Sequence, residues 1–271
     1  NIAFIHAASS YFRIHGIPEA DYPILPEMED AKSYTLEQAA FRNMLKLTAY
    51  AASPDPNRQL LHGVLLSFKA GKLSVVATDS RRLALVEHEV EFPADAELDM
   101  IVPLKTVEEL IRTLGESGEV KILANQKQVA FEFDGTLVIS KLVEGTYPNF
   151  RQVIPQSSPE RVAIEREPFL TAIRRTSQLV SDAVSGVKLT FTKNRLEVLA
   201  AAAEIGEGRE TMDVKYSGPD IAISFNPAFL MDPLKALTPD EVFLDLIDDT
   251  SPGVIRSTIN FVYVLMPIRV T

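Results

Sequence analysis

The residue types that most often carry catalysis or bind metals are few in this sequence and widely separated. Cysteine is absent, and the four histidines (His6, His15, His62 and His88) show no HExxH or other metal-ligand spacing. The lack of cysteine excludes thiolate nucleophiles, disulfides and Cys-based metal sites, and it favours a reducing, cytoplasmic compartment. We therefore interpret the histidines as solvated or structural, and we predict neither a cofactor nor a metal site.

Carboxylates offer two further sites for chemistry. Asp79 follows Thr78 at the end of an apolar segment, where a carboxylate could act as a general base. No second acid stands at a useful spacing, so a turn-forming aspartate is the simpler interpretation. Asp245, Asp248 and Asp249 lack the central glycine and terminal glutamate of an EF-hand, and we interpret them as an acidic surface turn. A hydrolase that uses Asp79 is the alternative from the enzyme class.

Basic residues recur on the segments that are expected to form helices. They occupy the same stage of each repeated unit described below: Arg42, Lys46, Lys105, Arg112, Arg174 and Arg175. If the units form an arc, these helices line one wall of it. Neighbouring acids, among them Glu108 and Glu109, favour the simpler interpretation of an ordinary solvated helix face when the helices are taken by themselves. The net charge of −10 argues against non-specific attraction to phosphate or acidic membranes, although a concave face can still be locally positive.

The elements that would position these residues repeat along the chain. Seven positions recur at a fixed offset of 123 (186 − 63): Gly63, Val64, Leu66, Phe68, Leu73, Val75 and Ala77 reappear as Gly186, Val187, Leu189, Phe191, Leu196, Val198 and Ala200. Alternation with period two on both sides of a polar turn predicts a β-hairpin with one buried face. The chain therefore contains a duplicated unit, and 271 residues are expected to hold about two domains.

Each unit is expected to follow one plan, with a strand and a helix before the hairpin and a strand, a second helix and further strands after it. The helices are predicted at 37–52, 104–114, 167–180 and 227–237. Asp232-Pro233 should kink or shorten the last of them, because proline cannot donate to the helix. Antiparallel hairpins with helices gathered on one face indicate the α+β class.

The repeat also predicts the domain boundaries. Ile2–His6 and Tyr11–His15 read as a hairpin, and the Tyr22-Pro23 pair that follows reappears as Tyr147-Pro148. We therefore expect residues 1–28 to be the end of a unit whose beginning is missing. A middle domain is expected at 29–155 and a last domain at 156–271.

Four segments resemble one family closely. They are 76–85 (VATDSRRLAL), 140–155 (SKLVEGTYPNFRQVIP), 224–237 (SFNPAFLMDPLKAL) and 263–270 (YVLMPIRV). In this order they resemble the β sliding clamp, the processivity subunit of bacterial DNA polymerase III. The family's frequent Thr-Asp-Gly-His-Arg-Leu stands here as Thr78-Asp79-Ser80-Arg81-Arg82-Leu83, and the resemblance extends over essentially all 271 residues.

The resemblance implies a non-catalytic protein of DNA replication. In the family, two three-domain subunits close head to tail around duplex DNA, with helices inward and sheets outward. The implied partners are duplex DNA bound without sequence preference, polymerase and clamp-loader subunits bound through linear motifs, and a second copy of the full-length subunit. No membrane is implied. By this reading most of the N-terminal domain is missing, and a ring is not expected to close without it.

The family also has a hydrophobic pocket between the middle and last domains that takes short peptide motifs. The resemblance places its near half at Leu61, Thr78, Ser80, Arg81, Arg82, Leu83, Pro148, Gln152 and Val153. Its far half would be Val184, Asn226, Phe229, Thr250, Pro252, Val264, Leu265, Met266, Pro267, Ile268 and Arg269. Aliphatic, Met and Pro side chains with a few polar groups suit an apolar linear motif. Ser80, Arg81 and Gln152 replace the family's Gly, His and frequent Arg, which bears on partner preference.

The DNA-facing residues implied by the resemblance are Arg58, Gln59, Leu60 and Lys105, joined by the helical cations named above. Gln59 and Leu60 stand where the family often has aromatic residues. Sliding requires weak, sequence-independent phosphate contacts, so a mildly basic interior on an acidic protein fits a topological tether. A repeat-built adaptor that never encircles DNA is the remaining alternative.

Overall fold

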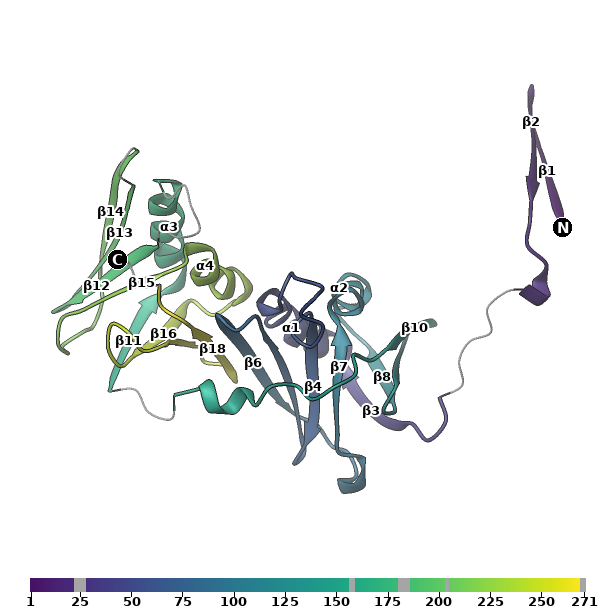
Figure 1. Cartoon of the computed structure of the whole chain (residues 1–271), viewed down its shortest axis with the longest axis horizontal. Coiled ribbons are helices and arrows are strands. Elements are labelled where there is room, and N and C mark those ends of the chain that lie inside the picture. Colours follow the sequence, from purple (N-terminus) through teal and green to yellow (C-terminus); the bar gives the residue numbers. More distant parts are fainter. Residues whose placement is uncertain (22–27, 156–158, 180–185, 203–204, 269–271) are drawn as a thin grey trace.

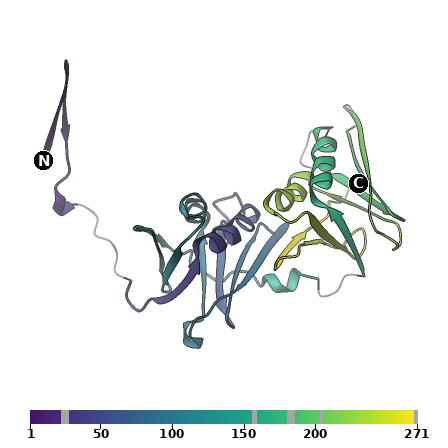
Figure 2. The same cartoon turned by 180° about the vertical axis from the view of Figure 1, so that it is seen from behind.

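The computed structural model describes residues 1–21, 28–155, 159–179, 186–202 and 205–268. Figure 1 shows an arc in which the helices lie along one side and the sheets along the other, and Figure 2 shows the same arc from behind. The mixture of antiparallel sheets and helices confirms the α+β class. Within the described ranges, no helix is long and apolar enough to cross a membrane.

The elements follow one another in three stretches. The first holds β1 (Ile2–Ala7), β2 (Ser10–His15) and η1 (Glu19–Asp21). The second holds β3 (Lys32–Glu37), α1 (Gln38–Lys46), η2 (Ala49–Ala51), β4 (Gly63–Lys69), β5 (Lys72–Thr78), β6 (Arg82–Glu89), η3 (Ala94–Ala96), β7 (Leu98–Pro103), α2 (Leu104–Thr113), β8 (Glu119–Ala124), β9 (Gln128–Phe133), β10 (Thr136–Lys141) and η4 (Phe150–Val153). The third holds β11 (Glu160–Glu165), α3 (Arg166–Thr176), η5 (Ser177–Leu179), β12 (Val187–Thr192), β13 (Arg195–Ala202), β14 (Gly206–Asp213), β15 (Ile221–Phe225), α4 (Pro227–Ala236), β16 (Glu241–Leu246), β17 (Gly253–Arg256) and β18 (Phe261–Leu265).

The predicted repeat is present in the strand register. Val64 pairs with Val102 across β4 and β7, and Val187 pairs with Phe225 across β12 and β15, at the same offset of 123 (187 − 64, 225 − 102). Helices α2 and α4 begin at Leu104 and Pro227, again 123 apart (227 − 104). The two stretches therefore fold alike, residue for residue, through the hairpin and the second helix.

One sheet runs through the junction of the two repeats. Its strand order is β11-β16-β17-β18-β6-β5-β4-β7, so β18 of the third stretch pairs with β6 of the second. Val264 lies opposite Leu83 in this pairing, and Leu265 lies opposite Arg82. The remaining strands form two four-stranded sheets, β10-β9-β8-β3 and β14-β13-β12-β15, and a separate β1-β2 hairpin.

The two faces of the eight-stranded sheet bury different apolar clusters. On one face Leu66 and Phe68 join the main core, together with Phe41 of α1 and Val107 of α2. The opposite face carries a second cluster, the outer cluster: Leu65, Val76, Leu83, Leu85, Ile101, Val254 and Val264, with Tyr147, Phe150 and Ile154 packed against it. The connecting segment 142–154, which we call the strap, thus lies on the outer face.

Two of the predicted helices end earlier than expected. Helix α1 ends at Lys46 rather than Ala52, because Thr48 leaves the helical conformation and its hydroxyl donates to the carbonyl oxygen of Met44 at 2.9 Å. Helix α3 ends at Thr176, whose hydroxyl donates to Ala172 O at 2.9 Å. Residue 180, the predicted end of α3, lies outside the described residues.

Proline does not shorten α4, which was one of the two effects expected of it. The helix passes through Pro233 and has ten residues, as α2 does. Pro233 has no N–H for the carbonyl of Phe229 four residues earlier. That carbonyl instead accepts a hydrogen bond of 2.8 Å from the hydroxyl of Tyr263 in β18. The side chain from the junction strand thus satisfies the group that the proline leaves free.

Replacing Tyr263 by Phe is therefore expected to lower the free energy of unfolding by about 1–3 kcal/mol, because it leaves a partly buried carbonyl without its donor. The loss should shrink in a Pro233→Ala background, where residue 233 regains its N–H. Tyr50 is the matched control, because its ring lies 5.9 Å from that of Tyr263 and its buried hydroxyl has no partner among the described residues. Urea unfolding of the wild type, Tyr263→Phe, Pro233→Ala, the double variant and Tyr50→Phe measures these losses. An equal loss of stability from Tyr263→Phe in both backgrounds would contradict the prediction.

Candidate functional site

The end of β18 lies beside the turn between β5 and β6. The backbone N–H of Met266 donates to Arg81 O at 2.9 Å, and that of Ile268 donates to Ser224 O at 2.8 Å. Met266 is 46% exposed although it directly follows the buried strand β18. Residues 266–268 therefore form an apolar strip between the β5-β6 turn and the end of β15.

The β5-β6 turn is held rigidly by its own side chains. Asp79 Oδ1 accepts hydrogen bonds from the N–H groups of Arg81 and Arg82 at 2.8 and 3.0 Å. Arg58 donates to Asp79 O at 2.8 Å and to Ser80 Oγ at 2.7 Å. Ser80 has φ +76°, in the left-handed region that favours glycine. The bond to Arg58 helps to hold this unusual conformation at the rim of the site.

Asp79 is engaged at both carboxylate oxygens. Its Oδ1 caps the turn, and its Oδ2 accepts a hydrogen bond of 3.1 Å from Arg82 Nε. The side chain is buried. A carboxylate so occupied is not free to remove a proton, so the geometry gives no support to the hydrolase alternative.

The strap forms the near wall of the predicted peptide pocket, on the side of the second stretch of elements. The N–H of Val143 donates to Ile101 O at 2.9 Å, and Arg151 Nη2 donates to Glu87 Oε1 at 2.8 Å. Between these two attachments the ring of Tyr147 packs against the outer cluster, and burial raises the pKa of its phenol. The strap thereby presents an exposed group of three residues beside the junction: Pro148, Gln152 and Val153.

The far wall consists of the start of α4 and the β16-β17 loop. Asn226 Oδ1 caps α4 by accepting from the N–H groups of Ala228 and Phe229 at 2.9 and 3.3 Å. The ring of Phe229 is half-buried and faces the guanidinium of Arg82 at 4.1 Å. Asp248 accepts hydrogen bonds from the loop residues Thr250 and Ser251, which fixes the loop that leads to Pro252.

We call the predicted peptide pocket the slot, and some of its residues are in contact, because the N–H of Met266 donates to Arg81 O and the ring of Phe229 faces the guanidinium of Arg82. At least partly exposed among the slot residues are Leu61, Thr78, Ser80, Arg81, Pro148, Gln152, Val153, Asn226, Phe229, Thr250, Pro252, Met266, Pro267 and Ile268. Four others are structural instead of surface residues. Leu83 and Val264 are buried in the outer cluster, Leu265 is buried in the main core, and the Arg82 side chain is only 9% exposed. Val184 and Arg269 lie outside the described residues.

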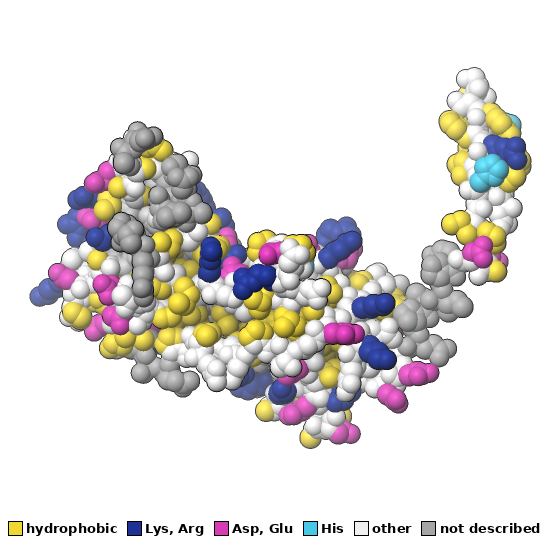
Figure 3. All heavy atoms as spheres, in the orientation of Figure 1, with side chains coloured by type: hydrophobic (Ala, Val, Ile, Leu, Met, Phe, Trp, Pro, Cys, Tyr) yellow, Lys and Arg dark blue, Asp and Glu magenta, His cyan; other side chains and the backbone are white. Residues whose placement is uncertain are grey.

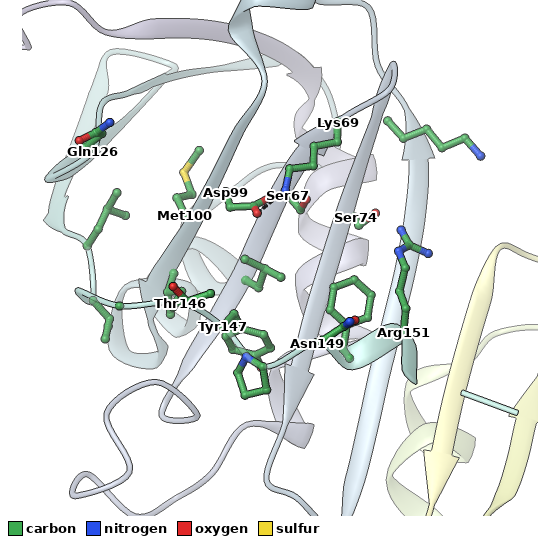
Figure 4. Close-up of a pocket in the computed structure, with 18 of the residues that line it drawn as sticks. Ser67, Lys69, Ser74, Asp99, Met100, Gln126, Thr146, Tyr147, Asn149 and Arg151 are labelled. Atoms are coloured by element: carbon green, nitrogen blue, oxygen red, sulfur yellow. Dashed lines mark hydrogen bonds and ion pairs between the residues drawn. The ribbon is translucent and has the colours of Figure 1, made fainter. Parts of the chain in front are cut away.

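The sequence did not reveal a cavity of about 830 Å³ beneath the strap. Figure 4 shows Tyr147 and Asn149 of the strap above strands that carry Ser67 and Ser74. Ser67 donates to Asp99 at 2.6 Å and Ser74 donates to Glu87 at 3.0 Å, so the floor is a polar row across neighbouring strands. Serines at mid-strand positions of an otherwise apolar hairpin were the only available signal. The cavity adjoins the slot, because Tyr147 and Pro148 line it.

The predicted DNA-facing residues separate into two groups. Lys46, Gln59, Lys105 and Arg174 are exposed, and so are Arg112 and Arg175, which pair with Glu109 and Glu210. In Figure 3, Lys and Arg side chains occur along the helix-bearing side but also on the opposite side, with Asp and Glu among them.

Three of the residues predicted to face DNA make contacts within the protein. Arg42 Nε donates to Ile111 O at 2.9 Å and the same guanidinium pairs with Glu116, so it ties α1 to the end of α2. Arg58 is committed to the β5-β6 turn. Leu60 packs against the outer cluster rather than on the helix side.

The aspartates predicted to share an acidic turn lie in different surroundings. Among the described residues, no three His, Asp or Glu side chains are grouped to hold a metal ion. We expected Asp245 to belong to an acidic surface turn, but its side chain is buried. It pairs with Arg161 at 2.6 Å and with Arg256 at 2.9 Å across three strands.

The loop that carries Thr250 gives a pH prediction. Hydrogen bonds from the backbone of Thr250 and Ser251 hold the pKa of Asp248 at about 2, below its ordinary 3.8. A lowered carboxyl pKa stabilises the loop above pH 3.8, and this contribution is lost as the pH falls toward 2. The carboxyl ¹³C shift of Asp248 should titrate near 2, and the Thr250 and Ser251 amides should lose exchange protection together. Asp248→Asn should remove the dependence, and a midpoint near 3.8 would contradict the assignment.

Comparison with known proteins agrees with this geometry. Residues 35–149 match the family model for the central domain of the DNA polymerase III β subunit, and residues 151–269 match the model for its C-terminal domain. The β sliding clamp of Chlamydia pneumoniae is 34% identical over 268 residues, covering 99% of this chain and 73% of the relative. The crystal structure of the Bacillus subtilis sliding clamp superimposes with a TM-score of 0.93 at 28% identity, covering 100% of this chain and 73% of that one.

A further structure, of a Pseudomonas aeruginosa sliding clamp bound to griselimycin, has a TM-score of 0.93 at 29% identity and covers 99% of this chain and 74% of that one. The matched models cover most of the chain, and the resemblance found in the four motifs is confirmed. The chain belongs to the β sliding clamp family, the non-catalytic β subunits of bacterial DNA polymerase III that serve DNA replication.

Proposed function

We propose that this chain works as part of a closed ring around duplex DNA and tethers polymerases and the clamp loader through the slot. Residues 29–155 and 156–271 would be the middle and last domains, and 1–28 the end of a preceding one. The observation that carries the proposal is the β18-β6 pairing, which joins two copies of one unit edge to edge with both helix pairs on the same side. Further copies joined in the same way would continue the curve.

The open strand edges support a ring made with a second copy of the full-length subunit. Strands β1 and β2 have the bounds of β9 and β10 shifted by 126 (128 − 126 = 2; 136 − 126 = 10), so β2 corresponds to β10 and β18. Strand β14 corresponds to β6 and is the edge of its sheet. A β18-β6 type of pairing would therefore add β2 of one copy to β14 of the other.

The side chains at these two edges are compatible with that register. The first residues of β18 and β2 differ by 251 (261 − 10), and those of β14 and β6 differ by 124 (206 − 82). With these shifts, the Tyr263↔Ala84 and Val264↔Leu83 pairs place Phe12 opposite Gly208 and Arg13 opposite Glu207. Phe12 is 57% exposed on the free hairpin. A Cβ at Gly208 would lie 2.7 Å from the side chain of Leu179, so this leucine occupies the space beside the glycine and would offer an apolar contact to Phe12. The pair of opposite charges would favour the head-to-tail arrangement.

The slot would take an extended apolar peptide. Met266, Pro267 and Ile268 offer a flexible apolar wall, and Pro148 and Val153 offer the opposite one. Occupation of the slot keeps a client near the DNA, so that rebinding after dissociation is intramolecular and its effective concentration is high. The P. aeruginosa relative binds griselimycin, and we propose that this compound occupies the same slot here.

Retention on circular DNA tests the encirclement. The full-length subunit, loaded by its clamp loader onto a nicked plasmid, should stay bound until the plasmid is linearised. A ring can leave only over a free end, whereas an adaptor that binds one side of the duplex would be lost equally from both forms. Equal retention on circular and linear DNA would reject encirclement without affecting the slot.

The exposed cations of the helices should set the salt sensitivity of this retention. Each phosphate contact contributes a slope of about −0.9 to log K against log salt, so Lys46→Ala, Lys105→Ala or Arg174→Ala should each lower the slope by up to about one unit. Lys188→Ala is the control with the same charge change, because Lys188 is exposed on the face of β12 that points away from the core. Identical salt dependence for Lys105→Ala and Lys188→Ala would remove the helices from the DNA contact.

A further inference from the structure

The Arg82 side chain lies behind the slot instead of in it. Its guanidinium donates to Asp79 at 3.1 Å, to Asp232 at 2.5 Å and to the carbonyl oxygen of Tyr50. With 9% of its side chain exposed, it has almost no surface for a bound peptide. The residue therefore cannot act on a client by direct contact, although it belongs to a segment whose neighbours line the slot.

The partners of Arg82 come from both sides of the junction. Tyr50 and Asp79 belong to the second stretch of elements, whereas Asp232 lies on α4 in the third, 150 residues away in sequence. The ring of Phe229, one helical turn before Asp232, faces the guanidinium at 4.1 Å. A single side chain thus ties the β5-β6 turn to the helix that carries the far wall.

The Arg82 guanidinium stays positively charged in this buried position. Burial alone would lower the pKa of Arg82, but Tyr263 and the hydrogen bond to Asp232 raise it above its ordinary value. A planar guanidinium is needed to reach three acceptors in different directions, which the single ammonium of lysine cannot do in the same geometry. Sheet pairing between β18 and β6 fixes the backbone of the junction. The Arg82–Asp232 bond and the contact of Arg82 with the Phe229 ring link the turn directly to α4.

We propose that Arg82 is a positioning residue that sets the width of the slot, by holding α4 against the β5-β6 turn. This inference rests on the proposed peptide-binding function of the slot. Loss of the Arg82–Asp232 bond would let the far wall, with Phe229, move relative to Ser80 and Arg81. A wider slot binds an extended peptide less well even though every residue that touches the peptide is unchanged.

Arg166 provides a matched control. Its side chain is also largely buried, at 13% exposed, and it donates to Leu234 O and Pro239 O at 2.9 Å each. These contacts reach α4 from within its own repeat and do not cross the junction. Arg166→Met and Arg82→Met should therefore both lower the unfolding temperature, but only Arg82→Met should change the slot.

The first experiment measures the dissociation constant of a fluorescein-labelled peptide from the C-terminal region of the same organism's replicative polymerase. We expect a rise of about tenfold for Arg82→Met and Asp232→Leu, no further rise in the double variant, and no change for Arg166→Met. Arg82→Lys should fall between Arg82→Met and the wild type. Equal affinity of wild type and Arg82→Met would overturn the positioning role and leave the slot standing.

The second experiment does not depend on peptide binding. Because the chain has no cysteine, spin labels can be placed cleanly at Asn149→Cys and Ala228→Cys, two exposed positions on the strap and on α4. Arg82→Met should broaden the distance distribution between the labels, and Arg166→Met should leave it narrow. An unchanged distribution in Arg82→Met would overturn the inference even if the peptide fails to bind the wild type, a failure that would count against the proposed function alone.

Discussion

Removal of residues 266–271 is expected to abolish binding of the polymerase peptide, with a loss of about 100-fold or more in affinity, while the fold stays intact. The reason is that Met266, Pro267 and Ile268 supply one apolar wall of the slot but little of the core. Met266 is 46% exposed, and the strip follows β18, which comes last in chain order among the described strands. Loss of one or two apolar anchors in the centre of an interface accounts for an effect of this size.

Fluorescence anisotropy with the labelled peptide measures the affinity, and urea unfolding measures the stability of the same samples. Ile259→Ala is the control, because Ile259 is apolar and 39% exposed but lies at the other end of β18 from Met266. It should bind the peptide as the wild type does. Unchanged affinity in the truncated chain would mean that the client peptide binds elsewhere, for instance under the strap.

The sequence predicted the repeated hairpins well because period-two alternation depends on one buried face. Leu66 and Phe68 are buried and Phe191 is buried at the repeated position, as the pattern required. Strand β14 was missed for the opposite reason. Its sequence, GEGRETMD, has glycines and charges and no apolar alternation, yet it pairs with β13 over eight residues as an exposed edge strand. Tertiary pairing overrides weak strand propensity at such an edge.

The junction could not be predicted from the sequence alone. The segment 261–265 reads as a buried strand, but nothing in it specifies β6 as its neighbour. For the same reason, motif resemblance could not separate the exposed members of the slot from the buried ones. Arg82 and Leu265 lie in motifs whose neighbours line the slot, and only the strand pairing shows that these two point into the junction.

The cations show a similar limit. Arg42 and Lys46 are four residues apart on α1, and both were predicted to face DNA. The structure separates them, because the guanidinium of Arg42 reaches the carbonyl of Ile111 and Glu116 whereas Lys46 is exposed. Carbonyl groups at the end of α2 need donors, and an arginine on the neighbouring helix is long enough to supply them. Such a contact depends on the α1-α2 packing and leaves no local signal.

The pairing of β18 with β6 makes a second large effect predictable. Val264 is 3% exposed and lies opposite Leu83 inside the outer cluster. Val264→Asp should place a carboxylate among aliphatic side chains, at a cost of about 4 kcal/mol or more in the free energy of unfolding at neutral pH. Val153→Asp introduces the same group at a slot position that is 52% exposed, and its stability should stay within about 0.5 kcal/mol of the wild type.

The pH dependence separates this mechanism from a simple loss of packing. A carboxyl group buried in the outer cluster has a folded-state pKa above its unfolded value of about 3.9, because burial disfavours the charged form. The cost of Val264→Asp should therefore be smallest below about pH 3, where the group is protonated in both states, and should grow as the pH rises from about 3.9 toward the folded-state pKa. Urea unfolding at pH 4.5 and pH 8 measures the difference, and Val264→Ala, which loses packing without adding a charge, should show the same cost at both. A pH-independent cost for Val264→Asp would mean that the new side chain escapes to solvent and that the β18-β6 junction opens more easily than the paired strands imply.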